Sequence, residues 1–351
     1  MSRKSIRQLK RWVLMSVSLM KNRRRLRKVG KQLRPGQRLV AIILVEHFGD
    51  IVACEPVTRY VRAIHPDDFI VWICRHQYRD LVSSHPDIDA VLTVSCLTEA
   101  FLLRDGAAFG RVIDLHINGR ACDWFGTLQD QAQGNANITI KNYFSHGSLL
   151  ESFCLAAGLP PLRDNPIFHV HTGDPPKRLP PTPYVIIHAA SLKPERDWPV
   201  EKWKSMLDIL AKEFPVTFVE VGLEPRVAPV GCVLDLCGQL SIVELAFHFK
   251  HCAVFIGVDS GPAHLANAFQ RPSLILMGRF KGFERYTPFS GFLQDHSEEM
   301  LVRSSGPVAE IPVELAAARA AEILRKYGRH PNIDPAPVNP SALPSPTHLS
   351  M

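Results

Sequence analysis

A continuous apolar run from Leu39 to Val45 constrains the fold of this chain more than any other feature. The run is rich in β-branched residues and does not alternate with polar ones, a pattern typical of a strand buried on both faces of a parallel sheet. It ends at His47-Phe48-Gly49-Asp50, and helical spacing follows from Ile51 to Ile64. A buried strand, a tight turn and a helix form the start of a βαβ unit, so we expect an α/β fold.

The same alternation of strand and helix patterns continues along the chain. In the first half, further strands are predicted at Phe69 to Cys74, Ala90 to Val94 and Arg111 to Leu115. In the second half, strands are predicted at Tyr184 to His188, Val216 to Val221, Ala253 to Val258 and Ser273 to Met277, and helices at Val200 to Glu213, Ile242 to Lys250, His264 to Phe269 and Glu310 to Lys326. We therefore expect two doubly wound, Rossmann-like domains that face a central cleft at the carboxyl ends of their strands.

Composition sets the predicted domain boundaries. Residues 172–183 contain five prolines and indicate an interdomain linker. Residues 330–351 are dominated by Pro and Ser and show no hydrophobic periodicity, which predicts a disordered tail. The predicted division is a basic amphipathic arm at 1–38, an N-terminal acceptor domain at 39–171, the linker at 172–183, a C-terminal nucleotide-sugar domain at 184–329 and the tail at 330–351.

Positive charge is concentrated in the predicted arm. Residues 1–38 contain 14 Lys and Arg and no acidic residue, whereas residues 39–351 contain 27 Lys and Arg against 34 Asp and Glu. A mildly acidic body argues against a nucleic-acid-binding face on the folded domains. The eight cysteines form no CxxC pair and no zinc-ligand spacing, so we interpret them as reduced thiols of a cytoplasmic protein and expect no metal site.

The arm also has an amphipathic pattern. Ile6, Leu9, Val13, Val17 and Met20 lie at helical spacing among basic residues, with Trp12 beside them. The apolar run is too short to span a bilayer, which needs about 20 residues, and no small-residue cleavage site follows it. Two interpretations are open: an interfacial helix on an anionic membrane surface, which would place the protein at the inner face of the cytoplasmic membrane, or a solvated, partly disordered tail.

The first candidate site is Asp259-Ser260-Gly261-Pro262-Ala263-His264 at the end of a predicted buried strand. Gly261 allows close backbone approach, Pro262 suits a helix start, and the free N–H groups of that start favour an anion such as a diphosphate. His264 is placed to hydrogen-bond a phosphate oxygen. Alternatively, the segment is only a capped helix with Asp259 or Ser260 as the N-cap, although capping does not need His264.

Three further segments follow predicted strands. Asp50 is a candidate general base, or else only the N-cap of the next helix. Ser191 lies in the segment before Trp198-Pro199, where its hydroxyl and the positive charge of Lys193 or Arg196 suit a leaving diphosphate, or where the segment only packs and starts a helix. Glu224 follows a strand and a glycine and suits ribose hydroxyls, or else lies in an ordinary surface turn. No GxSxG, HExxH, Walker A or GxGxxG motif is present.

Together and in this order, these elements resemble glycosyltransferase family 9, the ADP-heptose:lipopolysaccharide heptosyltransferases, over residues 39 to 327. Asp259-Ser260-Gly261-Pro262-Ala263-His264 is similar to the D-[ST]-G-x-x-H signature of that family. Gly49-Asp50 is similar to the N-terminal loop of that family, and Pro86-Asp87-Ile88-Asp89 and Trp198-Pro199 also fit its pattern. Arg196 stands where the family usually has Lys, and Glu46-His47-Phe48 departs from the small hydroxyl residues that commonly precede Leu-Gly-Asp.

The resemblance implies a GT-B fold and an inverting sugar transfer. It implies that Asp50 is the base, that Ser260, Gly261 and His264 contact the donor diphosphate, that Asp259 contacts the donor sugar or its phosphate, and that Glu224 binds the nucleoside ribose. The implied donor is ADP-heptose, the implied acceptor is a lipid-linked glycan such as the lipopolysaccharide core, and no cofactor is required. A sugar-nucleotide epimerase of similar build and a non-catalytic GT-B-like binding protein remain the alternatives.

Overall fold

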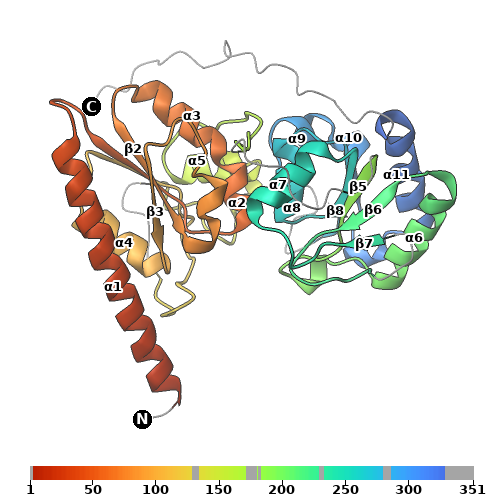
Figure 1. Cartoon of the computed structure of the whole chain (residues 1–351), viewed down its shortest axis with the longest axis horizontal. Coiled ribbons are helices and arrows are strands. Elements are labelled where there is room, and N and C mark those ends of the chain that lie inside the picture. The colour runs from red at the N-terminus through yellow and green to blue at the C-terminus, as the bar shows by residue number, and fades with distance from the viewer. Residues whose placement is uncertain are drawn as a thin grey trace.

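The computed structural model describes residues 3–128, 134–170, 180, 183–228, 233–279 and 286–328. Two sheets, each built of parallel strands, lie side by side, and helices cover the faces of each (Figure 1). Most of the predicted linker at 172–183 and all of the predicted tail at 330–351 lie outside the described residues.

The first sheet has the strand order β3-β2-β1-β4, and every neighbouring pair is parallel. Its strands are β1 (Leu39–Ile43), β2 (Phe69–Arg75), β3 (Ala90–Val94) and β4 (Arg111–Asp114). The chain order reverses between β1 and β4, which makes that point the topological switch of the sheet. The four predicted strands are confirmed to within two residues at each end.

The second sheet has the order β10-β9-β8-β5-β6-β7 and is also parallel throughout. Its strands are β5 (Tyr184–His188), β6 (Thr217–Glu220), β7 (Val233–Asp235), β8 (Val254–Val258), β9 (Ser273–Met277) and β10 (Leu301–Arg303). Counted from β5, this is the doubly wound order 3-2-1-4-5-6, with its switch point between β5 and β8. The short edge strands β7 and β10 were not predicted, because three residues carry too little periodicity.

Helices fill the connections between strands. Around the first sheet these are α1 (Arg3–Gln32), α2 (Phe48–Ala53), α3 (Glu55–Ile64), α4 (Leu97–Gly106) and α5 (Leu149–Ala156), with the 3-10 turns η1 (His76–Leu81) and η2 (Tyr143–Ser145). Around the second they are α6 (Val200–Glu213), α7 (Ile242–His251), α8 (Gly261–Ala268), α9 (Phe292–Asp295), α10 (Ser297–Met300) and α11 (Val313–Tyr327), with η3 (Pro194–Arg196) and η5 (Val308–Glu310). Alternate residues of β1 pack into different cores: Val40 and Ile42 on the side of α3 and α5, Ala41 and Ile43 on the side of α1 and α4.

The single helix predicted at Ile51 to Ile64 is wrong in one respect, because it is two helices. The break falls at Cys54, and Pro56 lies in the first turn of α3. Proline has no N–H and its ring clashes with the preceding turn, so it begins a helix more readily than it continues one. As a result, α2 is a separate short helix that lies at the boundary with the second sheet.

The helix α1 contradicts the interpretation of the arm as a disordered tail. Met15, Leu19 and Leu26 are buried on the first sheet in one cluster with residues of β2, β3 and α4. The stripe that the sequence singled out, which includes Val13 and Val17, is instead exposed. The predicted boundary at residue 38 therefore separates a helix from the sheet that it covers. Among the described residues, no helix is long and apolar enough to cross a bilayer.

Candidate functional site

The candidate site residues follow the carboxyl ends of strands near the two switch points. Asp50 follows β1, Arg196 follows β5, Glu224 follows β6 and Asp259 follows β8. Figure 1 shows α2, which carries Asp50, at the boundary between the sheets and next to α8. Because ligands of open α/β sheets bind outside the carboxyl ends of strands at such points, this boundary is the candidate active site.

Asp50 occupies the third position of α2 rather than its N-cap. The N-cap is His47, whose backbone N–H donates to Asp50 Oδ2 at 3.0 Å in a capping box. The expected N-cap role of Asp50 is therefore wrong in position, although the carboxylate does stabilise the start of the helix. This bond holds one carboxylate oxygen in a fixed orientation.

At the predicted cleft, α2 packs directly on α8 through two glycines. A Cβ atom built on Gly49 would lie 2.8 Å from His264 Cδ2 and 3.4 Å from Gly261 Cα. A Cβ atom built on Gly261 would lie 2.6 Å from Phe48 Cδ1. Side chains larger than hydrogen do not fit at either position without movement, so both glycines permit the close approach of Asp50 to the start of α8.

The start of α8 is not capped by a side chain. Ser260 occupies the N-cap position, but its hydroxyl donates to Val258 O at 3.0 Å instead of accepting from the helix. Asp259 accepts from Arg196 Nη1 at 2.9 Å. The expected N-cap position of Ser260 is therefore confirmed, although its side chain makes no cap, and Asp259 is not the N-cap. Among the described residues, the N–H of Gly261 has no side-chain acceptor.

His264 lies one turn into α8 and is 3% exposed. Its ring lies 4.8 Å from the ring of Phe289, centroid to centroid. Burial lowers the pKa of His264, while the charge of Asp259 acts in the opposite direction. Among the described residues, Nδ1 has no hydrogen-bond partner. A buried polar atom without a partner is costly, and a ligand oxygen would satisfy it.

The segment after β5 brings Arg196 to the site and uses Ser191 locally. Ser191 Oγ donates to Lys193 O at 2.6 Å, and its backbone N–H donates to Asp197. These bonds close the turn that leads into η3, at whose end Arg196 reaches Asp259. The hydroxyl of Ser191 is thus engaged in shaping the loop that positions Arg196.

Glu224 is an exposed residue in the turn after β6. The buried carboxylate of this region is Glu220, which accepts backbone N–H groups from Arg226, Val227 and Ala228. Gly222 has a φ of +152°, and a Cβ there would lie 3.4 Å from the ring of His188 at the end of β5. Glu220 therefore folds the turn, and Glu224 lies along it at the same edge of the sheet as His188.

Sequence reasoning missed a buried carboxylate beside the base candidate. Glu46 is 3% exposed and accepts from Arg120 Nε at 3.0 Å. Burial raises the pKa of Glu46 to about 7, against the opposing charge of Arg120, and the charge of Asp50 adds to the rise. Arg75 pairs with Asp123 at 2.8 Å nearby. The position of Glu46 directly after the β1 run was the available signal.

Two tyrosines complete the boundary and were also missed. The ring of Tyr143, from η2, lies 6.0 Å from that of Tyr286 in an edge-on arrangement. Burial raises the pKa of both phenols, and the charges of Asp50 and Asp259 raise them further. Tyr286 follows β9 in the chain yet packs in the core of the first sheet. Only the placement of one sheet against the other could have revealed this pair.

One cluster of potential metal ligands lies away from the switch points: Glu55, His85 and His169. Asp87 N–H donates to His85 Nδ1 at 3.1 Å, so Nε2 carries the proton that it donates to Glu55 at 2.8 Å. Arg59 also donates to Glu55. A cation here would meet a protonated nitrogen and a neutralised carboxylate, so the contacts fit a structural hydrogen-bond network and not a metal centre.

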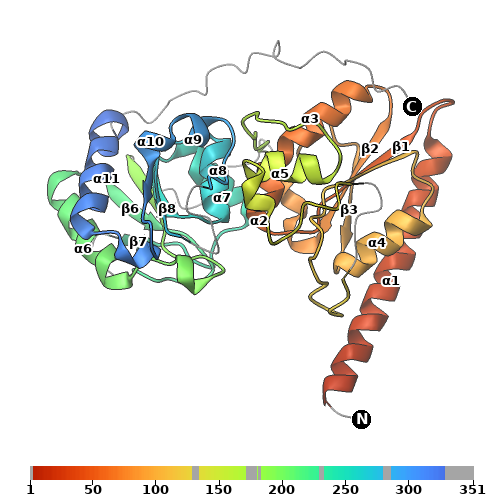
Figure 2. The ribbon, with the colours of Figure 1, turned by 180° about the vertical axis from the view of Figure 1, so that it is seen from behind.

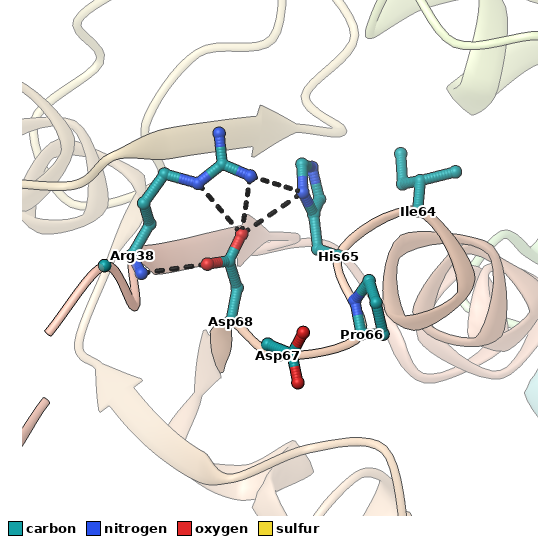
Figure 3. A pocket seen from close by; sticks show the side chains of 7 residues that line it. Arg38, Ile64, His65, Pro66, Asp67 and Asp68 are labelled. Carbon is teal, nitrogen blue, oxygen red and sulfur yellow. Dashed lines mark hydrogen bonds and ion pairs between the residues drawn. The ribbon is translucent and has the colours of Figure 1, made fainter. Parts of the chain in front are cut away.

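A surface pocket of 290 Å³ lies at the amino ends of the strands of the first sheet, away from the candidate active site (Figure 3). Asp68, just before β2, accepts from Arg38 at 2.8 Å and approaches His65 Nδ1 at 3.3 Å. These residues precede β1 and β2, at the amino ends of the strands. Their polar groups already bond one another, so the pocket belongs to the connection between α1, α3 and the sheet.

The chain is similar to known proteins both in sequence and in fold. Residues 171–281 match the model of the family described as glycosyltransferase family 9 (heptosyltransferase). The chain is 28% identical over 106 residues to lipopolysaccharide heptosyltransferase 1 of Campylobacter coli, and 31% identical over 105 residues to lipopolysaccharide heptosyltransferase 3 of Escherichia coli. Each alignment covers 27% of this chain and 31% of the relative, so sequence similarity spans about a third of those proteins.

By fold, the chain is similar to the ADP-heptose lipopolysaccharide heptosyltransferase II of Escherichia coli. The TM-score is 0.57 at 15% identity, over 83% of this chain and 99% of that one. At this identity the comparison establishes the fold alone. The predicted GT-B architecture and the predicted resemblance to family 9 are both confirmed.

Proposed function

We propose, from the resemblance to glycosyltransferase family 9, that this protein is an inverting glycosyltransferase that moves a sugar from a nucleotide-sugar donor to a glycan acceptor. The observation that carries the proposal is the packing of α2 on α8 through Gly49 and Gly261. It places a carboxylate from one sheet beside an uncapped helix start from the other. A displacement reaction needs a base on one side of the anomeric carbon and positive charge on the other.

Asp50 is the proposed base. Its carboxylate accepts the proton of the acceptor hydroxyl as that oxygen attacks the anomeric carbon of the donor. The bond from His47 N–H to Asp50 Oδ2 keeps the carboxylate in one orientation during this step. Attack from the side opposite the leaving group forms the new glycosidic bond with inversion, while the bond to the diphosphate breaks.

The leaving nucleoside diphosphate is proposed to bind at the start of α8. The N–H group of Gly261 at the helix start and the charge of Arg196 stabilise the developing negative charge. His264 Nδ1 supplies a further contact to a phosphate oxygen, which would satisfy that buried atom. Asp259 holds Arg196 in place before the donor arrives. We propose that the hydroxyl of Ser191 and the carboxylate of Glu224 line the part of the donor site that holds the nucleoside.

The proposed donor is ADP-heptose and the proposed acceptor is a glycan such as the lipopolysaccharide core. Both follow from the relatives, whose names specify lipopolysaccharide heptosyl transfer. Since such an acceptor is lipid-linked, we also propose that the protein works as a peripheral enzyme at the inner face of the cytoplasmic membrane, with residues 1–38 toward the lipid. The proposal includes no cofactor.

The test is acceptor-dependent release of ADP. The purified chain is incubated with ADP-heptose, with and without lipopolysaccharide from cells that lack core heptose, and both ADP and the acceptor mass are followed. The proposal expects ADP release and a heptose mass increase only with acceptor. Isomerisation of the donor without acceptor would instead indicate an epimerase. Thermal stabilisation by ADP without any turnover would indicate a binding protein, and either result would overturn the proposal.

A further inference from the structure

The helix α1 has two apolar faces, and only one of them is used by the fold. Met15, Leu19 and Leu26 are at most 9% exposed and pack on the first sheet. Between them, Asn22 donates to Thr93 O at 2.9 Å and to Glu99 Oε1 at 3.1 Å. A buried amide with both of these partners fixes the rotation of the helix on the sheet.

The second apolar face points away from the sheet. It consists of side chains that are 40–56% exposed and lie three or four residues apart: Ile6, Leu9, Val13, Val17 and Met20. Val13 and Met15 are two residues apart, which turns the helix by about 200°, so this stripe lies opposite the docked face. Figures 1 and 2 show the N-terminal half of α1 extending beyond the body of the protein. The stripe is about 20 Å long at 1.5 Å per residue.

Charge decides what can cover this stripe. The α1 sequence contains twelve Lys and Arg and no acidic residue. Exposed cations continue the line of the stripe toward the C-terminal end of the helix, at Arg24, Arg27 and Lys31. A second copy of α1 would bring like charges together without a counter-charge. An apolar stripe bordered by cations matches a bilayer with anionic headgroups.

An aromatic group lies beside the stripe. The ring of Trp12 packs on that of Phe125 at a tilt, with 4.4 Å between the ring centroids, and Arg11 donates to Trp124 O at 3.0 Å. Leu128, in the same loop, is 67% exposed. Aromatic rings and cations are favoured at the level of lipid headgroups. The loop therefore extends the surface of α1 toward the residues that follow β4.

We propose that this outer face of α1, named by its stripe Ile6, Leu9, Val13, Val17 and Met20, is a rigid docking surface for anionic membranes. This inference rests on the proposed function. The outer face of α1 would hold the first sheet against the bilayer that carries a lipid-linked acceptor. It goes beyond a flexible basic arm, because the bond from Asn22 and the burial of Leu19 fix which side of the helix meets the lipid.

The test compares vesicle binding of the full chain and two matched double variants. Val13→Asp with Val17→Asp changes the outer face. Ile209→Asp with Leu315→Asp makes the same change at 44% and 46% exposed positions on α6 and α11 of the other sheet. Sedimentation is measured with phosphatidylcholine vesicles that contain or lack phosphatidylglycerol. We expect the first variant to lose binding to anionic vesicles by about tenfold or more, and the second to bind like the wild type.

Two further arms separate the outcomes. Replacing Arg24, Arg27 and Lys31 by Gln should weaken binding only to the anionic vesicles, and added salt should do the same. Equal sedimentation of wild type and the outer-face variant would overturn the proposal, as would a lipid-free dimer that this variant dissociates. Stabilisation by ADP is measured on every variant. If ADP stabilises all of the variants while the outer-face variant binds vesicles like the wild type, the docking surface is refuted and the proposed function stands. If the wild type binds vesicles but no nucleotide stabilises it, the proposed function is refuted and the docking surface stands.

Discussion

Gly49 of the first sheet and His264 of the second are in such close contact that a Cβ atom on Gly49 would lie 2.8 Å from His264 Cδ2. This contact joins the turn that carries the candidate base to the helix that carries the candidate diphosphate site. Because the clash would be with a ring that is itself buried, neither partner can move freely.

Replacing Gly49 by Ala should therefore separate α2 from α8. We expect a loss of about 1–3 kcal/mol in the free energy of unfolding, together with a fall in kcat. Denaturant unfolding and the transfer assay measure the two effects. Gly30→Ala is the control, because nothing lies within 4 Å of a Cβ at that helical position and stability should be unchanged or slightly higher. An unchanged Gly49→Ala variant would refute the proposed contact.

Arg196 tests the leaving-group side. Replacing it by Ala removes the cation that Asp259 holds at 2.9 Å, and kcat should fall by about 10²–10³-fold. Replacing it by Lys keeps the charge but not the forked geometry, so a smaller loss is expected. Steady-state kinetics measure kcat for both variants and show which of them loses more activity. A fully active Arg196→Ala enzyme would remove Arg196 from the mechanism.

Glu46 predicts a pH dependence of stability. Its pKa in the folded protein is raised to about 7 by burial, against the charge of Arg120. The folded state therefore binds a proton more tightly than the unfolded chain, and the stability due to this group is present below the unfolded pKa and is lost as the pH rises through about 7. Glu46→Gln cannot titrate, so the wild type should lose stability relative to this variant across that window, by on the order of 3 kcal/mol.

Thermal unfolding of both proteins across the window measures this difference. Glu314→Gln, at an exposed acid on α11, is the matched control and should follow the wild type. Parallel curves for the wild type and Glu46→Gln would show that Glu46 is ionised throughout.

The network of Glu55, His85 and His169 predicts that metal ions do not stabilise the fold. His85 Nε2–H already donates to Glu55, and the other ring nitrogen of His85 accepts from Asp87 N–H. Added Zn²⁺ should therefore leave the Tm unchanged. A rise in Tm that His169→Ala abolishes would contradict this assignment and identify a metal centre.

The sheets could be predicted from the sequence because their strands are continuous β-branched runs such as Leu39 to Val45, which suit only a doubly buried position. The docked face of α1 could not, since Met15, Leu19 and Leu26 form a weaker pattern than the exposed stripe that includes Val13 and Val17. Periodicity reveals an apolar face but not whether the protein itself covers it.

The positions of the candidate site residues were predictable one strand end at a time. Asp50, Arg196 and Asp259 each follow a predicted strand, and parallel sheets bring such positions to one edge. Glu46 directly follows the β1 run, and that position was the available signal for it. Tyr143 and Tyr286 were not predictable, because their contact depends on how one sheet is placed against the other. Long-range placement of this kind leaves no local signal in the sequence.

The central claim is that Asp50 is the base, and Asp50→Asn tests it most directly. Asparagine retains an oxygen that can accept from His47 N–H, so the α2 turn should be preserved. Acceptor-dependent ADP release and the thermal shift caused by ADP are measured on the same preparation. The account predicts that kcat falls by about 10²–10⁴-fold while the ADP shift stays at the wild-type value; turnover near the wild-type rate would contradict it.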